Sequence, residues 1–429
     1  MERMYRFLNR EKEARVCNGI TEKACIHAHK NYFVIIATNV LTQLGDVLSA
    51  PKTVLIWIMG SLGAPVFLTS LLVPIRESGS MLPQYFLSSV FNNMPLRKWG
   101  WIIGALVQAF SLFGIVFVVN LFSGAHAGIW IIVLVALFSL GRALCSLLSK
   151  DVIGKTIPKT RRGKLNGYSS SLSGVLVLIS AVILLFHPIE NAALPALAKL
   201  VAIAGSLWII ATLMYAQIIE YPNERKDEIK KNTRSFFSLI KKDTTLQKFI
   251  IARGLLISSA LMSPFVILLS QKYIGTDLYI LGLFILSGGL ASIVSGPIWG
   301  YLADISSKKV IIRAASIVAV TSIAIVILLS LKSTLIQSLW IYPVILFILN
   351  IAHDGIRLGR KTYILDIAEG ETRTQYVATS NTVIGMLLLV IGFFTAWLGS
   401  VSLVSAIAVL TLMVLAGIWV SSGLREVGE

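Results

Sequence analysis

Ionisable side chains interrupt several long apolar stretches of this sequence. They are Asp46, Lys52, Arg76, Glu77, Arg142, Asp354 and Arg357. A charged side chain in the interior of a lipid bilayer costs about 2.5–3.5 kcal/mol on insertion scales, so it usually faces a partner charge or a water-filled cavity. If these stretches cross a membrane, the charges mark a polar site for a solute or a proton.

The first two apolar stretches hold a pair of carboxylates that could exchange protons. Asp46 lies about half-way along the first stretch, and Glu77 follows Arg76 near the middle of the second. Burial favours the neutral carboxylic acid, whereas a nearby arginine favours the carboxylate. A solute that competes for the arginine would therefore change the protonation of a carboxylate, which is a physical route to proton coupling.

The other charges leave alternatives open. Arg142 either lines the site or is a structural arginine that hydrogen-bonds helix ends. Asp354 and Arg357 are three residues apart and can pair on one helix face. In the whole set four cations outnumber three carboxylates, which favours an anionic or zwitterionic solute unless the pairs neutralise one another.

The composition requires that most of the chain lies in a membrane. Of its 429 residues 56% are hydrophobic and only 14% are charged, with a mean hydropathy of +0.80. A water-soluble protein of this size could not hide so much apolar surface. A net charge of +17 would suggest nucleic acid in a soluble protein, but here Lys and Arg are concentrated between the apolar runs, so no nucleic acid is expected.

The apolar runs predict an all-α membrane protein with twelve spans. The expected limits are 33–58, 63–90, 99–121, 127–149, 165–187, 194–219, 249–271, 278–302, 309–331, 335–360, 374–397 and 400–422. They form two six-helix bundles, 33–219 and 249–422, joined by a hydrophilic linker at 220–248 and flanked by tails at 1–32 and 423–429. The cations gather on the side of both tails and the linker, so we expect a multi-pass protein of the inner (plasma) membrane with both termini in the cytoplasm.

The two halves show signs of internal duplication. The pair Arg97-Lys98 recurs as Lys308-Lys309 at an offset of 211 residues. Arg142 and Asp151, nine residues apart, recur as Arg357 and Asp366 at an offset of 215. Such a repeat predicts pseudo-two-fold symmetry, with a binding site near the middle of the membrane between the halves.

One loop resembles the signature of a known family. The string GYLADISSKK contains Gly300, Leu302, Ala303, Asp304, Lys308 and Lys309. It resembles the loop between spans eight and nine of the major facilitator superfamily. The resemblance implies transport by alternating access, with Asp304, Lys308 and Lys309 holding a cytoplasmic gate shut.

The gate has further candidate residues and one alternative explanation. Gly300 would let two helices approach closely. Asp366 and Arg373 are candidate partners of the gate charges, and the alternative is that these charges only set the topology. The first-half copy of the signature has Asn93 where an acid is expected.

The sequence lacks the patterns of several other functions. It has no phosphate-binding loop and no paired catalytic groups, so neither ATP-driven transport nor an enzyme is expected. Cys17, Cys25, His27 and His29 match no standard metal pattern, and no disulfide framework or cofactor is implied. The family's Gly-Pro antiporter signature is absent from span five, which disfavours drug–proton antiport.

We therefore predict a secondary active transporter, acting as a monomer in the lipid bilayer, that imports a small polar or anionic solute together with H⁺. One alternative is efflux of drugs or metabolites, which an aromatic cavity from Trp57, Phe67 and Phe91 would favour. The other is a membrane sensor or assembly protein that retains the fold without transporting.

Overall fold

The computed structural model describes residues 17, 20–83, 87, 94–185, 193–222, 243–367 and 372–426, and in this part of the chain all regular elements are helices. Ten helical segments there are long and apolar enough to cross a membrane. The expected first span is divided between the helices Glu22–Leu48 and Val54–Ser61, and the described helix of the second, Val66–Met81, has only 16 residues. Neither span is among the ten. The ten segments and these two spans together account for the twelve spans that the sequence predicts.

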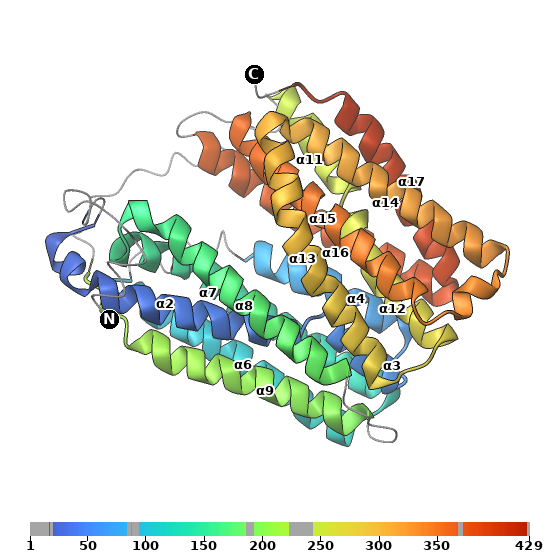
Figure 1. Ribbon diagram of the computed structural model, residues 1–429, viewed down its shortest axis with the longest axis horizontal. Helices are drawn as coiled ribbons and strands as arrows, with labels where there is room; N and C mark the ends of the chain where they lie inside the picture. The colour runs from blue at the N-terminus through green and yellow to red at the C-terminus, as the bar shows by residue number, and fades with distance from the viewer. Residues whose placement is uncertain are drawn as a thin grey trace.

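The helices form two bundles (Figure 1). The N-half contains α2 (Glu22–Leu48), α3 (Val54–Ser61), α4 (Val66–Met81), α6 (Arg97–Leu121), α7 (Gly124–Thr156), α8 (Arg162–Leu185) and α9 (Ala193–Ala216). The C-half contains α11 (Thr244–Leu255), α12 (Ser258–Tyr273), α13 (Leu278–Ile305), α14 (Ser307–Ser330), α15 (Ile341–Asp366), α16 (Thr372–Val401) and α17 (Leu403–Ser422). The starts of α2 and α11 and the end of α17 lie at one end of the molecule, which we call the terminal face. We call the other end the opposite face.

Proline interrupts the first span next to its charges. The helix stops after Leu48 and resumes at Val54, with Pro51 between. Proline has no N–H to donate and disfavours a helical conformation in the residue before it. The break leaves Lys52 in a turn at the level of the membrane, where only cavity-facing or protein-covered backbone is tolerated.

Small residues set the rotation of the helices that carry Arg142 and Arg357. A Cβ on Gly141 of α7 would lie 2.5 Å from the carbonyl oxygen of Gly104 on α6, so these two helices are in backbone contact. In the C-half, a Cβ on Gly355 of α15 would lie 2.6 Å from the Trp299 ring. Because these glycines face neighbours within their own half, the adjacent arginines point elsewhere.

Carboxylates hold the starts of α6 and α14 on the terminal face. Glu220, just past α9, accepts hydrogen bonds from the backbone N–H groups of Arg97 (3.0 Å) and Lys98 (2.8 Å) and pairs with Lys155 at 3.0 Å. In the C-half Glu426, just past α17, lies 3.4 Å from Lys309 and 4.0 Å from Lys308. Both carboxylates stabilise a helix N-terminus, because that end of the helix carries a partial positive charge.

The disulfide of the described tail was not expected from the sequence. Cys17 and Cys25 are bonded, with a Cα–Cα distance of 5.6 Å. The sequence implied no disulfide framework, because the spacing of two cysteines does not show whether their Cα atoms lie within disulfide distance.

We predict that Glu220→Gln destabilises the protein by about 2–4 kcal/mol, because it leaves Lys155 without a counter-charge in a site where the Glu220 side chain is 0% exposed. Thermal unfolding of the purified protein in detergent measures this. The matched control is Glu426→Gln, whose side chain is 51% exposed and whose loss should have a much smaller effect. Equal losses in the two variants would contradict the prediction.

Candidate functional site

Asp46 joins three helices of the N-half through two arginines. Its Oδ1 lies 3.1 Å from Arg76 Nη2 of α4, and its Oδ2 pairs with Arg142 Nη1 of α7. The side chain of Arg76 is only 8% exposed and lies 5.0 Å from the centre of the Phe138 ring, a cation–π contact. The structure thus brings together three of the residues that the sequence proposed for the site.

Lys52 and Glu77 lie between this cluster and the other half of the protein. Within the described residues neither makes an ion pair shorter than 4.0 Å, and both are half-buried. Glu77 is the charged group that acts most strongly on Lys52, followed by Arg357 and Asp354 of α15. The charges of the two halves therefore form one electrostatic site.

The C-half contributes a local ion pair, as predicted. Arg357 Nη2 lies 2.9 Å from Asp354 Oδ1, and Ser295 of α13 donates to Asp354 Oδ2 at 3.0 Å. His353 Nδ1 lies 3.0 Å from the hydroxyl of Ser259 on α12. The Arg357 side chain is 58% exposed, so solvent reaches the middle of this helix.

Two further arginines belong to this region and were missed. Arg253 lies near the start of the expected span 249–271, where an arginine can extend to the membrane surface, but it hydrogen-bonds Ser380 and Asn381 of α16. Arg360 was treated as the end of a span, although it follows Arg357 by three residues and His353 by seven. That spacing places all three on one helix face and could have identified it.

The site carries an excess of positive charge. Its cations are Lys52, Arg76, Arg142, Arg253, Arg357 and Arg360, and its carboxylates are Asp46, Glu77 and Asp354. Six cations against three carboxylates leave an excess of three positive charges when all are ionised. Within the described residues no cluster of His, Cys, Asp and Glu could hold a metal ion.

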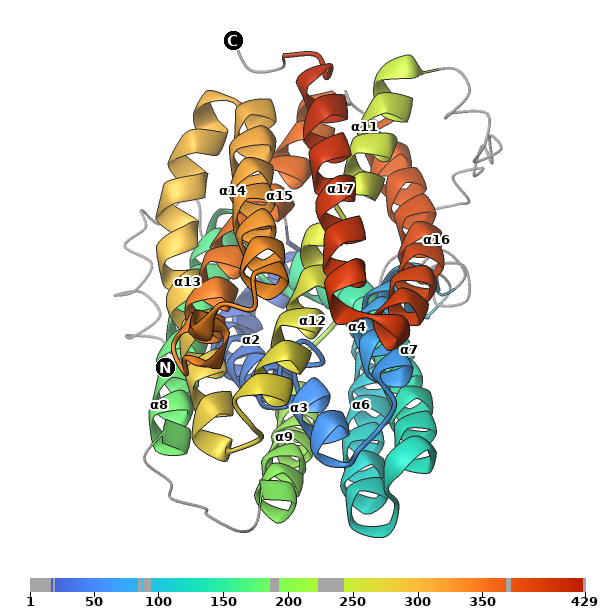
Figure 2. The ribbon, with the colours of Figure 1, turned by 90° about the vertical axis from the view of Figure 1, so that its right-hand side faces the viewer.

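The halves are joined near the opposite face. Trp57 Nε1 donates to the carbonyl of Thr276 at 3.3 Å, and Gln271 Nε2 donates to the carbonyl of Trp57 at 3.2 Å. The Trp57 ring also packs edge-on against Phe284, with centroids 6.0 Å apart. Toward the terminal face the two bundles diverge (Figures 1 and 2).

The aromatic residues proposed for an efflux cavity have structural contacts. Trp57 seals the opposite face as described above. Phe67 packs edge-on against Phe393 of α16, with centroids 5.3 Å apart. Phe91 lies outside the described residues, so the structure shows no aromatic cavity formed by these three.

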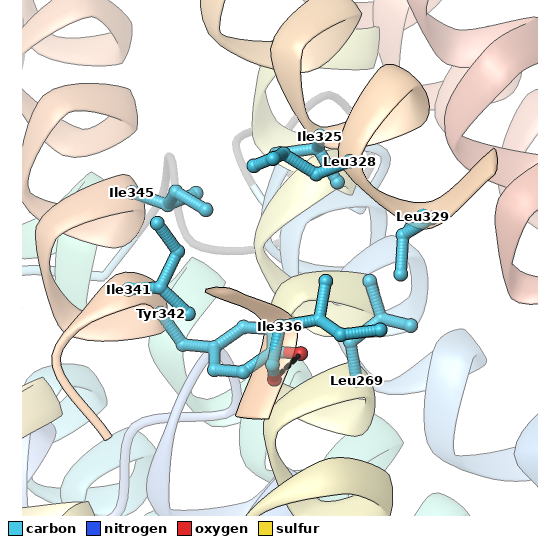
Figure 3. A pocket seen from close by; sticks show the side chains of 8 residues that line it. All are labelled: Leu269, Ile325, Leu328, Leu329, Ile336, Ile341, Tyr342 and Ile345. Carbon is cyan, nitrogen blue, oxygen red and sulfur yellow. Dashed lines mark hydrogen bonds between the residues drawn. The ribbon is translucent and has the colours of Figure 1, made fainter. Parts of the chain in front are cut away.

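A small apolar cavity in the C-half is separate from this site (Figure 3). It has a volume of about 10 Å³, enough for one water-sized probe, and no charged side chain lines it. Tyr342 donates to the carbonyl of Ile336 in the short 3₁₀ helix Thr334–Gln337 beside it. We regard this cavity as a packing feature.

The comparisons with known proteins agree with this architecture. The family model of the Major Facilitator Superfamily matches residues 35–385. The chain belongs to the major facilitator superfamily. No curated protein matches it by sequence.

Solved structures show the superfamily fold over nearly the whole chain. A D-xylose–proton symporter is 12% identical, with a TM-score of 0.68, and the match covers 92% of this chain and 98% of that one. The nucleoside transporter NupG, as a mutant, is 11% identical with a TM-score of 0.67, covering 91% and 99%. A bacterial homologue of the iron transporter ferroportin in an inward-facing state is 14% identical with a TM-score of 0.65, covering 92% and 98%.

The superfamily's signature loop is only partly as expected. A Cβ on Gly300 would meet no atom within 4 Å, so the prediction that Gly300 permits a close helix contact is wrong in this conformation, where the halves diverge. Asp366 accepts a hydrogen bond from Ser307 at 2.9 Å, within its own half. The side chains of Asp304 and Arg373 lie outside the described part, so their role in a gate stays a prediction.

We predict that Asp46 and Arg76 are energetically coupled. Asp46→Asn leaves Arg76 and Arg142 without their carboxylate, and Arg76→Gln leaves Asp46 with Arg142 alone, so each single variant should lose stability. In the double variant the loss should be smaller than the sum by about 1–3 kcal/mol. Thermal unfolding of the four proteins in detergent measures this coupling, and additive losses would show that the pair is not a unit.

Proposed function

We propose that this superfamily member is a secondary active transporter that moves a small anionic solute by alternating access, coupled to protons. The observation that carries the proposal is the excess of positive charge where the charges of both halves meet. Guanidinium groups bind carboxylate and phosphate through paired hydrogen bonds. An anion would balance charges that are otherwise expensive to hold inside a membrane.

The conformation supports an alternating-access cycle. Contacts of Trp57 and Gln271 close the opposite face, and Asp46, Arg142 and Arg357 have side chains that are 23%, 37% and 58% exposed. Solvent therefore reaches the site from the terminal face. The complementary state requires the contacts at the opposite face to break and the terminal ends to meet.

Charge distribution supports a cytoplasmic terminal face. Lys and Arg are frequent in the segments on this face, among them Lys98, Lys155, Arg162, Lys308 and Lys309. In this orientation the structure is open to the cytoplasm.

The Asp46 cluster offers a mechanism for proton coupling. In the structure Arg76 and Arg142 both stabilise the Asp46 carboxylate. A solute anion that draws Arg142 away weakens this stabilisation and favours protonation of Asp46. Solute and proton would then bind together, and both would leave when the arginine returns to Asp46. The relative named as a D-xylose–proton symporter shows that the fold can host such coupling.

Efflux of lipophilic compounds is the second candidate. An apolar groove of about 430 Å³ lies between α2 and α8, lined by Phe33, Ile36, Val40, Leu172 and Leu176 among others. It favours a substrate with an apolar part. A sensor without transport would need no solute pathway, and the charged site argues against it.

The first experiment is a thermal-shift screen of the purified protein with carboxylates, phosphates, sugars, nucleosides and lipophilic cations. A ligand that binds only the folded state raises the melting temperature. We expect an oxyanion to stabilise the wild type and to lose its effect in Arg142→Gln. Stabilisation by lipophilic cations alone would favour efflux and contradict the proposed substrate class.

We predict that uptake of such an anion into proteoliposomes depends on pH in the wild type. An inward proton gradient should accelerate uptake, and the acceleration should disappear in Asp46→Asn because that side chain cannot release a proton. Glu77→Gln tests the second carboxylate in the same way. If both variants are accelerated as much as the wild type, these two residues are excluded from the coupling.

We predict that Gly60→Ala opens the opposite face. The added Cβ would overlap the amide of Gln271, which must move and break its bond to Trp57. Spin labels at Ser123 and Lys272, one on each half, should report a larger population of long distances. Gln271→Ala removes the same hydrogen bond without an added Cβ and should shift the distances in the same direction. An unchanged distance distribution in both variants would contradict the closure.

A further inference from the structure

Arg253 of α11 is a charged side chain without a counter-charge. Its Nη1 donates to Ser380 at 2.7 Å and its Nη2 to Asn381 at 2.8 Å, and both acceptors on α16 are neutral. Its Nε is enclosed and has no hydrogen-bond partner. Within the described residues no carboxylate lies within 4.0 Å of this guanidinium.

Arg360 of α15 is in the same situation. It makes no hydrogen bond or ion pair with the described residues, and its enclosed Nε is also without a partner. Arg357, three residues before it, is paired with Asp354 at 2.9 Å. No local carboxylate therefore remains for Arg360.

A ring contact between α11 and α15 places the two arginines at the same level. The rings of Phe249 and Tyr363 stack with centroids 5.3 Å apart. The two helices run in opposite directions, so one turn inward from this contact is Arg253 on α11 and Arg360 on α15.

The start of α11 is fixed to the rest of the C-half. Asp243 caps the helix by accepting from the backbone N–H groups of Thr245 (2.8 Å) and Leu246 (3.1 Å), and it also accepts a hydrogen bond from Tyr376 of α16. Burial raises the pKa of the Asp243 carboxyl, but these three hydrogen bonds outweigh it and leave the pKa below its usual value. Asp243 therefore remains a helix cap, ten residues away from Arg253.

We propose that Arg253 and Arg360 form an oxyanion subsite in the C-half, which binds the carboxylate or phosphate group of the solute on the terminal side of Arg357. The inference rests on the proposed function and assigns its anion to residues outside the central cluster. Two like charges at the same level in a low dielectric repel each other, and an anion bound by both removes that cost. Ser380 and Asn381 hold the Arg253 guanidinium in place, so less conformational entropy is lost when the anion binds.

The position also suggests how the anion moves. Arg360 is three residues, or about 4.5 Å along the helix, nearer the terminal face than Arg357. A solute entering from the terminal face meets Arg253 and Arg360 first. It then reaches Arg357 and Lys52, where the charges of the two halves interact.

The test measures binding of inorganic phosphate and of succinate to the full-length protein in nanodiscs of zwitterionic lipid, by thermal shift, against chloride at equal ionic strength. We expect saturable stabilisation of the wild type. Arg253→Gln and Arg360→Gln should each weaken the apparent affinity at least about tenfold, since charge-assisted hydrogen bonds are lost. Arg360→Lys keeps the charge and should lose less.

The matched control is Lys248→Gln, which removes one cation from the exposed surface of the same helix and should bind like the wild type. Repeating the titration in nanodiscs with anionic lipid distinguishes a lipid phosphate from a free solute. If the headgroup occupies the subsite, anionic lipid will reduce the shift by phosphate in the wild type but not in Arg253→Gln.

Two results would overturn the inference. One is oxyanion binding that is as strong in Arg253→Gln and Arg360→Gln as in the wild type, and the other is no binding of either anion to the wild type. If the first result appears together with loss of binding in Arg142→Gln, the anion belongs to the central cluster and the proposed function stands. If no anion binds while a neutral or cationic solute is transported, the anionic substrate class itself fails.

Discussion

The structure depends on how positive charges are kept inside a membrane. Asp46 meets this constraint by accepting two arginines at once, from α4 and α7. Each guanidinium alone would be costly in that environment, and together they would repel each other. The carboxylate therefore fixes the relative positions of three helices in the N-half. It also leaves that cluster with one unbalanced positive charge, which is a property that an anion carrier needs.

The same constraint explains how the two halves resemble each other. In both, a carboxylate that follows the last helix reaches back to the start of the third span, Glu220 to α6 and Glu426 to α14. Glu220 is fully enclosed, whereas Glu426 is half exposed. The N-half lacks the signature acid at Asn93, yet its helix N-terminus has a strongly bound carboxylate from elsewhere in the chain. A helix start needs an anion, and the fold can supply it from more than one position.

The halves differ most in how their arginines are neutralised. In the N-half Arg76 and Arg142 share one carboxylate, and in the C-half Arg357 has Asp354 while Arg253 and Arg360 have no carboxylate partner in the described residues. This asymmetry gives the two bundles different tasks in the proposed cycle. In that proposed cycle the N-half would exchange a proton at Asp46, and the C-half would hold the anion. Contact between them at the level of Lys52 and Glu77 is what would couple the two events.

The sequence by itself determined the number of spans, their approximate positions and the superfamily, because the length of an apolar run and a signature loop are properties of local sequence. It also identified Asp46, Arg76 and Arg142 as costly charges, since burial in a bilayer follows from position along a span. It could not determine that Asp46 pairs with arginines 30 and 96 residues away, that Cys17 bonds Cys25, or that Gly300 faces open space. Those facts depend on the rotation of each helix about its axis and on the angle between the halves. Both are set by contacts between distant residues, such as Gly104 with Gly141 and Phe249 with Tyr363, and only the tertiary structure decides them.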